Sequence, residues 1–93
     1  MAKTLLLILN PRAGRTRSTA PLFDAVAYFC EAGYLVSVRR TTHPGPAAEI
    51  VEAEGADFDR IVCCGGDGTL NETVRGAMGL DAPPPLGYIP SGS

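Results

Sequence analysis

The sequence predicts a doubly wound α/β domain, with a parallel sheet of about four strands and three helices. Short apolar segments alternate with segments of helical spacing in the order β-α-β-α-β-α-β, and the connections have the length that parallel strands require. The first apolar segment, residues 3–10, is a nearly continuous aliphatic run. Such a run is typical of a strand buried on both faces of a parallel sheet.

The first helix is expected between this strand and Gly33. Ser18 or Thr19 can cap it, Pro21 suits its first turn, and Gly33 provides a residue that ends helices readily. Apolar residues recur at helical spacing along one face: Leu22, Val26, Phe29 and Cys30. This stripe predicts packing against the core and not a cofactor site.

The remaining elements follow from the same two periodicities. They are a strand over 34–41, a helix over 47–55 that stops at Gly55, a strand over 59–64, a helix over 69–78 and a strand over 86–90. Gly76 is expected to weaken the last helix. Right-handed crossovers then cover both faces of the sheet in a Rossmann-like arrangement. With the strand order 2-1-3-4, the order reverses between strands one and three.

Composition limits the classes of function. The 93 residues are 45% hydrophobic and 19% charged, which suits one small globular domain. A net charge of −2 creates no basic field, so nucleic acid is not an expected partner. The longest apolar run, residues 5–9, is too short to span a bilayer. The three cysteines are odd in number and lack zinc-site spacing, so we expect small buried hydrophobes in a reduced, cytoplasmic protein.

The unusual residues fall where the predicted strands end, which is where open α/β sheets bind ligands. Strand one ends in "NPRAG" (10–14), strand two in "TT" (41–42), strand three in "GGDG" (65–68) and strand four in "PSGS" (90–93). Bare glycines let backbone N–H groups approach an anion, and the following helix adds its positive dipole end. A carboxylate beside a phosphate requires a cation, so Asp67 indicates Mg²⁺. These residues predict a site for a nucleotide phosphate chain with its metal.

A structural alternative exists for part of this segment. Thr69 and Glu72 form T-x-x-E, a capping box, so both residues can simply start the helix. For Thr69 alone, capping and ligand binding are equally good interpretations, but capping explains neither the glycine pair nor Asp67. "NPRAG" is a weaker signal, in which Arg12 could neutralise phosphate. Neither a P-loop motif nor a G-x-G-x-x-G fingerprint is present in the sequence.

Three segments resemble a known family in order and spacing. "ILNPRAG", "VCCGGDGTLNE" and "LGYIPSGS" are similar to the catalytic domain of diacylglycerol kinases, including bacterial lipid kinases and sphingosine kinases. The resemblance covers essentially the whole chain. NAD kinases share the Gly-Gly-Asp-Gly core, but they usually continue differently, and Leu70-Asn71-Glu72 favours the lipid kinases.

The resemblance implies that residues 1–93 form an N-terminal ATP-binding α/β domain, followed in the family by a larger β-rich domain that is absent here. The ATP contacts that it implies fall on Asn10, Pro11, Arg12, Ala13, Gly14, Thr41, Gly66, Asp67, Gly68, Thr69, Leu70, Asn71 and Glu72. Asp67 is the implied catalytic residue, in the network around magnesium and the γ-phosphate, and no residue is assigned as a direct metal ligand. Ala13 replaces the family's usual serine, so one hydroxyl contact is lost.

The implied function is that of an ATP-dependent lipid kinase. The intact protein would transfer the γ-phosphate of ATP to a hydroxyl of diacylglycerol or a similar lipid, and would work at a membrane surface as a peripheral, cytoplasmic protein. The chain ends before the family's Asn-Asp segment, so we expect a fragment that holds Mg-ATP weakly and is itself inactive. Its unpaired sheet edges make self-association a further expectation. The alternatives are an NAD kinase-like phosphotransferase and a nonenzymatic nucleotide-binding module.

Overall fold

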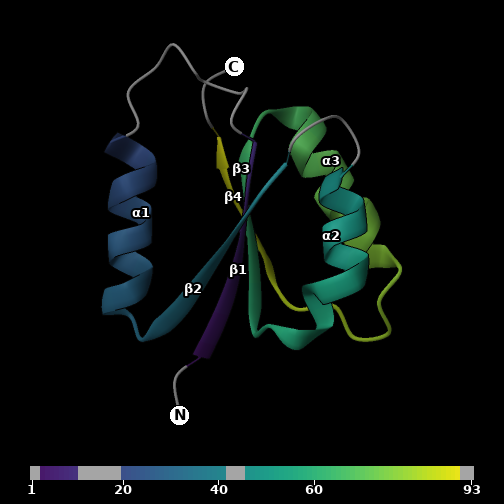
Figure 1. Ribbon diagram of the computed structural model, residues 1–93, viewed down its shortest axis with the longest axis horizontal. Coiled ribbons are helices and arrows are strands. Elements are labelled where there is room, and N and C mark those ends of the chain that lie inside the picture. Colours follow the sequence, from purple (N-terminus) through teal and green to yellow (C-terminus); the bar gives the residue numbers. More distant parts are fainter. Residues whose placement is uncertain (1–2, 11–19, 42–45, 91–93) are drawn as a thin grey trace.

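The computed structural model describes residues 3–10, 20–41 and 46–90, and these form one sheet with helices on both faces (Figure 1). The strands are β1 (Lys3–Leu9), β2 (Tyr34–Arg40), β3 (Arg60–Gly65) and β4 (Leu86–Pro90). All neighbouring strands are parallel, and their order is β2-β1-β3-β4. The predicted fold class is therefore confirmed, and with this strand order the switch point lies between β1 and β3.

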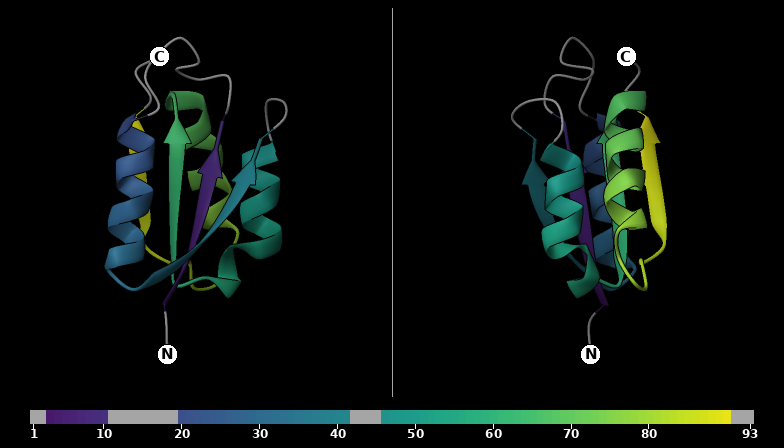
Figure 2. Two further views of the ribbon diagram at one scale, coloured as in Figure 1. Left: turned by 60° about the vertical axis from the view of Figure 1, so that its left-hand side comes forward. Right: turned by 90° about the vertical axis from the view of Figure 1, so that its right-hand side faces the viewer.

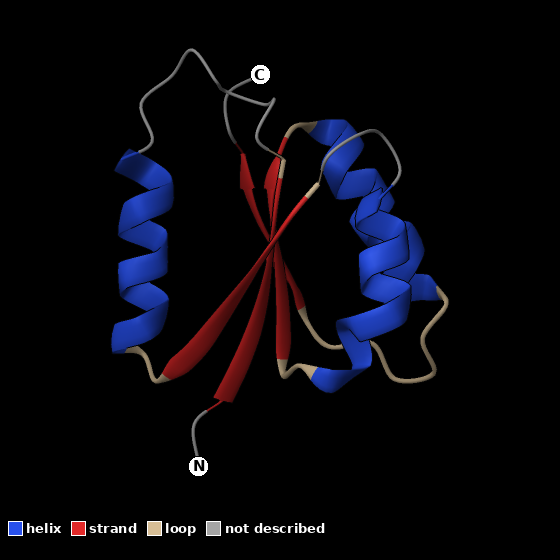
Figure 3. Ribbon diagram, in the orientation of Figure 1, coloured by secondary structure: helices blue, strands red, loops and turns tan. Residues whose placement is uncertain are grey.

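The helices form two layers, one on each side of the sheet. Helix α1 (Ala20–Glu31) covers one face, and α2 (Pro46–Glu54) and α3 (Asp67–Met78) cover the other (Figures 2 and 3). A short 3-10 turn over Gly55–Asp57 links α2 to β3. All four strands point their carboxyl ends to the same edge of the sheet, where α3 begins.

Strand β1 lies at the centre because its side chains are apolar in both directions. Leu5 and Leu7 pack into the core cluster under α1, whereas Leu6 and Ile8 pack into the cluster under α2 and α3. Each of these four side chains is at most 1% exposed. Burying an aliphatic side chain of this size contributes roughly 1.5–3 kcal/mol, so this run anchors both layers.

Helices α2 and α3 pack tightly against each other at Gly76. A Cβ atom on Gly76 would lie 2.6 Å from the carbonyl oxygen of Ala48 and 2.8 Å from the Cβ of Val51. A glycine that looks like a weakness in the sequence is therefore the residue that lets two helix backbones pack together.

The predicted end of α1 is confirmed and the predicted start of α3 is wrong. Helix α1 ends at Glu31, and Gly33 follows with a φ of +97°, a conformation that side chains rarely adopt. Helix α3 begins at Asp67, two residues before the expected start, with Gly66 as its N-cap. Thr69 is therefore the third residue of the helix and does not cap it. The capping box, the structural alternative for Thr69 and Glu72, therefore does not form.

The cysteine prediction is correct for two of the three residues. Cys63 and Cys64 are buried, on opposite faces of β3, but Cys30 is exposed. Leu22, Val26 and Phe29 pack against the sheet, and Cys30 lies beyond the edge of this stripe. The apolar face of α1 is thus narrower than the sequence suggested.

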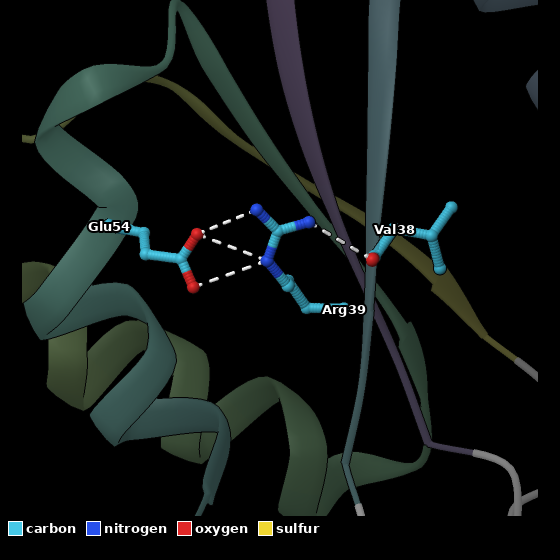
Figure 4. A network of polar contacts seen from close by, with 3 residues as sticks. All are labelled: Val38, Arg39 and Glu54. Atoms are coloured by element: carbon cyan, nitrogen blue, oxygen red, sulfur yellow. Dashed lines mark hydrogen bonds and ion pairs between the residues drawn. The ribbon is translucent and has the colours of Figure 1, made fainter.

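An ion pair ties the edge strand β2 to α2. The Arg39 guanidinium donates to both carboxylate oxygens of Glu54, and the closest contact joins Nη2 and Oε1 at 2.8 Å (Figure 4). Its Nη1 also donates to the carbonyl oxygen of Val38 at 3.2 Å. The hydrogen bond and charge of Glu54 raise the pKa of Arg39. Part of the β2 edge is therefore covered by a charged side chain.

Candidate functional site at the carboxyl edge of the sheet

The ends of β1 and β3 are joined by Asn10. Its backbone N–H donates to the carbonyl oxygen of Cys64 at 3.1 Å, and its side-chain Nδ2 donates to Thr69 Oγ1, also at 3.1 Å. Thr69 is only 7% exposed, so this contact is sheltered from water. Asn10, the first residue of the first of these segments, therefore meets the third-strand segment at the point where the strand order reverses.

The glycines of the third-strand turn have different roles. A Cβ on Gly65 would lie 2.6 Å from Thr69 Oγ1 and 2.9 Å from Thr69 Cβ, so packing requires this glycine. A Cβ on Gly68 would meet no atom of the described residues within 4 Å. Gly68 is also exposed and helical, and its φ is not positive. Alanine is generally favoured over glycine in helices, by roughly 0.5–1 kcal/mol in a helix interior, so the described part of the fold gives no reason for a glycine here.

The start of α3 presents an uncapped helix end beside that open space. Gly66, the N-cap, has no side chain, and no side chain among the described residues caps the helix. The first N–H groups of a helix lack partners within the helix and carry a partial positive charge. Asp67 is the first residue of α3 and is exposed. A donor array and a single carboxylate thus lie side by side.

Tyr88 is a neighbour of this turn that the sequence interpretation missed. It pairs with Cys63 in the β3–β4 register, and its hydroxyl donates to the carbonyl oxygen of Gly65 at 3.1 Å. Burial raises the pKa of the Tyr88 phenol, and the negative charge of Asp67 raises it further. The strand predicted over 86–90 includes Tyr88, but nothing in the sequence indicates which group its hydroxyl contacts.

The other predicted site residues lie in different surroundings. Thr41, at the end of β2, is 6% exposed, and its backbone N–H donates to the carbonyl oxygen of Leu9 at 2.9 Å. Leu70 packs against the core below α3. Asn71 is exposed, and Glu72 lies 3.6 Å from Arg75 along the same helix. Four predicted contacts lie outside the described residues: Pro11, Arg12, Ala13 and Gly14.

The described part of the chain also contains a hollow of about 390 Å³ between α1 and the β4 side of the sheet. Phe29, Tyr34, Arg60 and Tyr88 are among the residues that line it, whereas none of the described residues predicted from the sequence for the site does. Over the same described ranges, no cluster of three or more histidine, cysteine or acidic side chains is arranged as a metal site. Nor is any of the helices described long and apolar enough to cross a membrane.

The fold and this edge define a doubly wound α/β protein with an open glycine turn at the switch point. The chain belongs to the diacylglycerol kinase catalytic domain family, whose model matches residues 4–93. This confirms the resemblance noted in the sequence.

Individual relatives agree with this assignment. The chain is 41% identical over 92 residues to the diacylglycerol kinase of Bacillus subtilis (strain 168), covering 98% of this chain and 30% of that protein. It is 36% identical over 100 residues to the sphingoid long-chain bases kinase 1 of Arabidopsis thaliana, covering 99% of this chain and 13% of that protein. A solved Bacillus anthracis str. Sterne protein assigned as a diacylglycerol kinase superposes with a TM-score of 0.84 at 31% identity, covering 97% and 33%. The chain therefore spans less than a third of the curated relatives' length and about a third of that solved structure.

Proposed function

We propose that this chain is the ATP-binding part of a lipid kinase, which transfers the γ-phosphate of ATP to a hydroxyl of diacylglycerol or a similar lipid. The family supports ATP as the phosphate donor, and the names of the relatives support a lipid acceptor. The observation that carries the nucleotide site is Gly68, because no described residue approaches its Cβ position, in a helix turn that would accept alanine equally well.

The phosphates are proposed to bind against the first turn of α3. Glycine at position 68 lets phosphate oxygens approach the backbone N–H groups closely, since no side chain stands between them. The positive end of the α3 dipole adds attraction for the anion. Asn10 supports this turn from β1 through its bond to Thr69.

Asp67 is proposed to act through Mg²⁺. A carboxylate next to a triphosphate would repel it, whereas Mg²⁺ characteristically binds one or two carboxylates together with phosphate oxygens and water. Asp67 is exposed at the start of α3, which suits this role. Bound Mg²⁺ would neutralise charge that develops during phosphoryl transfer, and the chain itself would orient the phosphates.

The work of the enzyme is proposed to be divided. This chain holds and positions Mg-ATP, whereas the lipid site and the group that activates the acceptor hydroxyl lie in parts of the relatives that it does not match. The 93-residue chain alone would therefore bind Mg-ATP weakly without phosphorylating lipid. The complete kinase would meet its substrate at a membrane surface as a peripheral protein.

Gly68→Ala provides the test. Titration calorimetry of the 93-residue chain with Mg-ATP should show binding that the variant weakens about tenfold or more, because the methyl group occupies the phosphate space. Urea unfolding should show a stability that is unchanged or higher by roughly 0.5–1 kcal/mol.

The matched control is Gly79→Ala, since Gly79 follows the other end of α3 and its Cβ would meet only ordinary contacts, the nearest at 3.5 Å. This variant should bind like the original chain. Failure of the original chain to bind Mg-ATP, or equal binding by Gly68→Ala, would refute the nucleotide site.

A further inference from the structure

Tyr88 connects the edge strand β4 to the turn that leaves β3. Its hydroxyl donates to Gly65, whose carbonyl is the last of β3, and the next residue is the N-cap of α3. The contact is partly buried, and Tyr88 itself is 36% exposed at the rim of the site. The phenol therefore acts on the residue from which the candidate phosphate turn starts.

The other described contacts at this turn are backbone hydrogen bonds, from Asn10 N–H to the Cys64 carbonyl and from Leu70 N–H to the Gly66 carbonyl, and the packing of Gly65 on Thr69. Gly65 and Gly66 are consecutive, and glycine has more backbone freedom to lose than any other residue. From β1, Asn10 reaches Thr69, which lies beyond the turn and within α3. The Tyr88 hydroxyl is the side-chain group, among the described residues, that hydrogen-bonds the carbonyl before the turn.

We propose that Tyr88 is a positioning residue of the nucleotide site: its hydroxyl fixes the Gly65 carbonyl and thereby orients the N–H groups of the following turn toward the phosphates. For the ligand, this proposal rests on the proposed function. The Tyr88 hydroxyl fixes the turn in the ligand-free chain as well, and this part does not depend on the nucleotide.

The phenol is a donor suited to this task at neutral pH. Burial and the Asp67 charge both favour its protonated form, so the proton stays available for the Gly65 carbonyl. Removing only the hydroxyl leaves the ring and its packing in place. The expected loss is that of one neutral hydrogen bond, about three- to tenfold in binding.

Tyr88→Phe is the test, with Tyr34→Phe as its matched control. Tyr34 also carries a hydrogen-bonded hydroxyl, which accepts from Arg60 Nε at 3.2 Å, but it lies at the opposite, amino end of the strands. In ligand-free chain, Tyr88→Phe should move the ¹H–¹⁵N signals of Gly66 and Gly68 and speed their amide exchange. By calorimetry it should weaken Mg-ATP about three- to tenfold. Tyr34→Phe should do neither.

The outcomes separate the two claims. Unchanged Gly66 and Gly68 signals in Tyr88→Phe, or equal loss of Mg-ATP binding in both variants, would overturn the positioning role. A chain that binds no Mg-ATP would overturn the proposed function and, with it, the ligand half of this inference. Changes at Gly66 and Gly68 confined to Tyr88→Phe would then still support Tyr88 as the residue that sets the turn.

Discussion

Asp67 is the first residue of α3, and it precedes a glycine whose Cβ position no atom in the described part of the chain approaches within 4 Å. An acidic residue in the first turn of a helix is stabilising on its own, by about 0.3–1 kcal/mol, through the helix dipole. If Asp67 had only this structural role, its replacement would not change how ATP affinity depends on Mg²⁺. If Asp67 acts through Mg²⁺, its replacement should remove that dependence.

We accordingly expect Asp67→Asn to abolish the advantage of Mg²⁺. ATP affinity of the 93-residue chain should rise with Mg²⁺ in the original chain and become nearly independent of it in the variant, because the neutral amide no longer attracts the cation. Titrations with and without Mg²⁺ measure the ratio. Asp57→Asn, on the 3-10 turn before β3, is the control that should keep the full magnesium effect. A retained magnesium effect in Asp67→Asn would contradict the assignment.

Residue-level features were predictable where local chemistry decides them. The sequence places the glycine turn and Asp67 correctly at the carboxyl end of β3, because the apolar run ends there, and their role in binding stays a prediction. The start of α3 was not predictable, because the T-x-x-E pattern looks the same whether Thr69 caps the helix or lies inside it. Tertiary contact decides: Thr69 Oγ1 accepts from Asn10, 59 residues away in the chain.

Helix α3 packs on α2 through a surface that only a glycine allows. Replacing glycine by alanine within a helix usually stabilises by roughly 0.5–1 kcal/mol. At Gly76 the same change places a methyl group 2.6 Å from the backbone of Ala48, which cannot rotate away. The sign of the effect should therefore be reversed.

Gly76→Ala is expected to lower the free energy of unfolding by about 1–3 kcal/mol, the usual range for an overpacked core. Urea denaturation provides the measurement. Gly68→Ala, in the same helix but in open space, should show no loss. Equal or greater stability of Gly76→Ala would mean that α2 and α3 can separate at little cost.

Strands and helix ends were predictable from the sequence to within about two residues, because periodicity and breakers mark them. The contact between elements was not, because a sequence gives the spacing of a stripe and not its partner. Cys30 illustrates this. It belongs by spacing to the same helical stripe as Leu22, Val26 and Phe29, but only these three pack against the sheet and Cys30 is exposed. Gly76 is the opposite case: the sequence suggests only that it weakens α3, whereas the structure shows that it lets α3 pack against Ala48 and Val51 of α2.

In the folded molecule, burial favours the neutral form of two thiols and one phenol, those of Cys63, Cys64 and Tyr88. Burial raises the pKa of the Cys63 thiol above its ordinary value of 9.0, despite an opposing hydrogen bond with Thr73, and burial likewise raises the pKa of Cys64. Tyr88 shifts in the same direction, above its ordinary value of 10.0. In the unfolded chain these groups ionise at their ordinary values, so alkali favours unfolding.

Stability should therefore be fully present below pH 9 and should fall as the pH rises through the ordinary thiol and phenol range toward the raised values. Urea unfolding at pH 7, 9 and 10 tests this. Cys63→Ala should reduce the decline, whereas Cys30→Ala, which removes an exposed thiol, should leave it unchanged. A stability that is constant over this pH range would contradict the expectation.

The central position of β1 has a consequence for how the chain becomes folded. One neighbour of β1 is β2, but the other is β3, and Thr4 and Asp59 exchange hydrogen bonds across 55 residues of chain. During synthesis on the ribosome, one backbone edge of β1 therefore lacks its partner until β3 has emerged. Pairing across such a sequence separation slows folding, and an unpaired apolar strand favours aggregation of the nascent chain in the meantime.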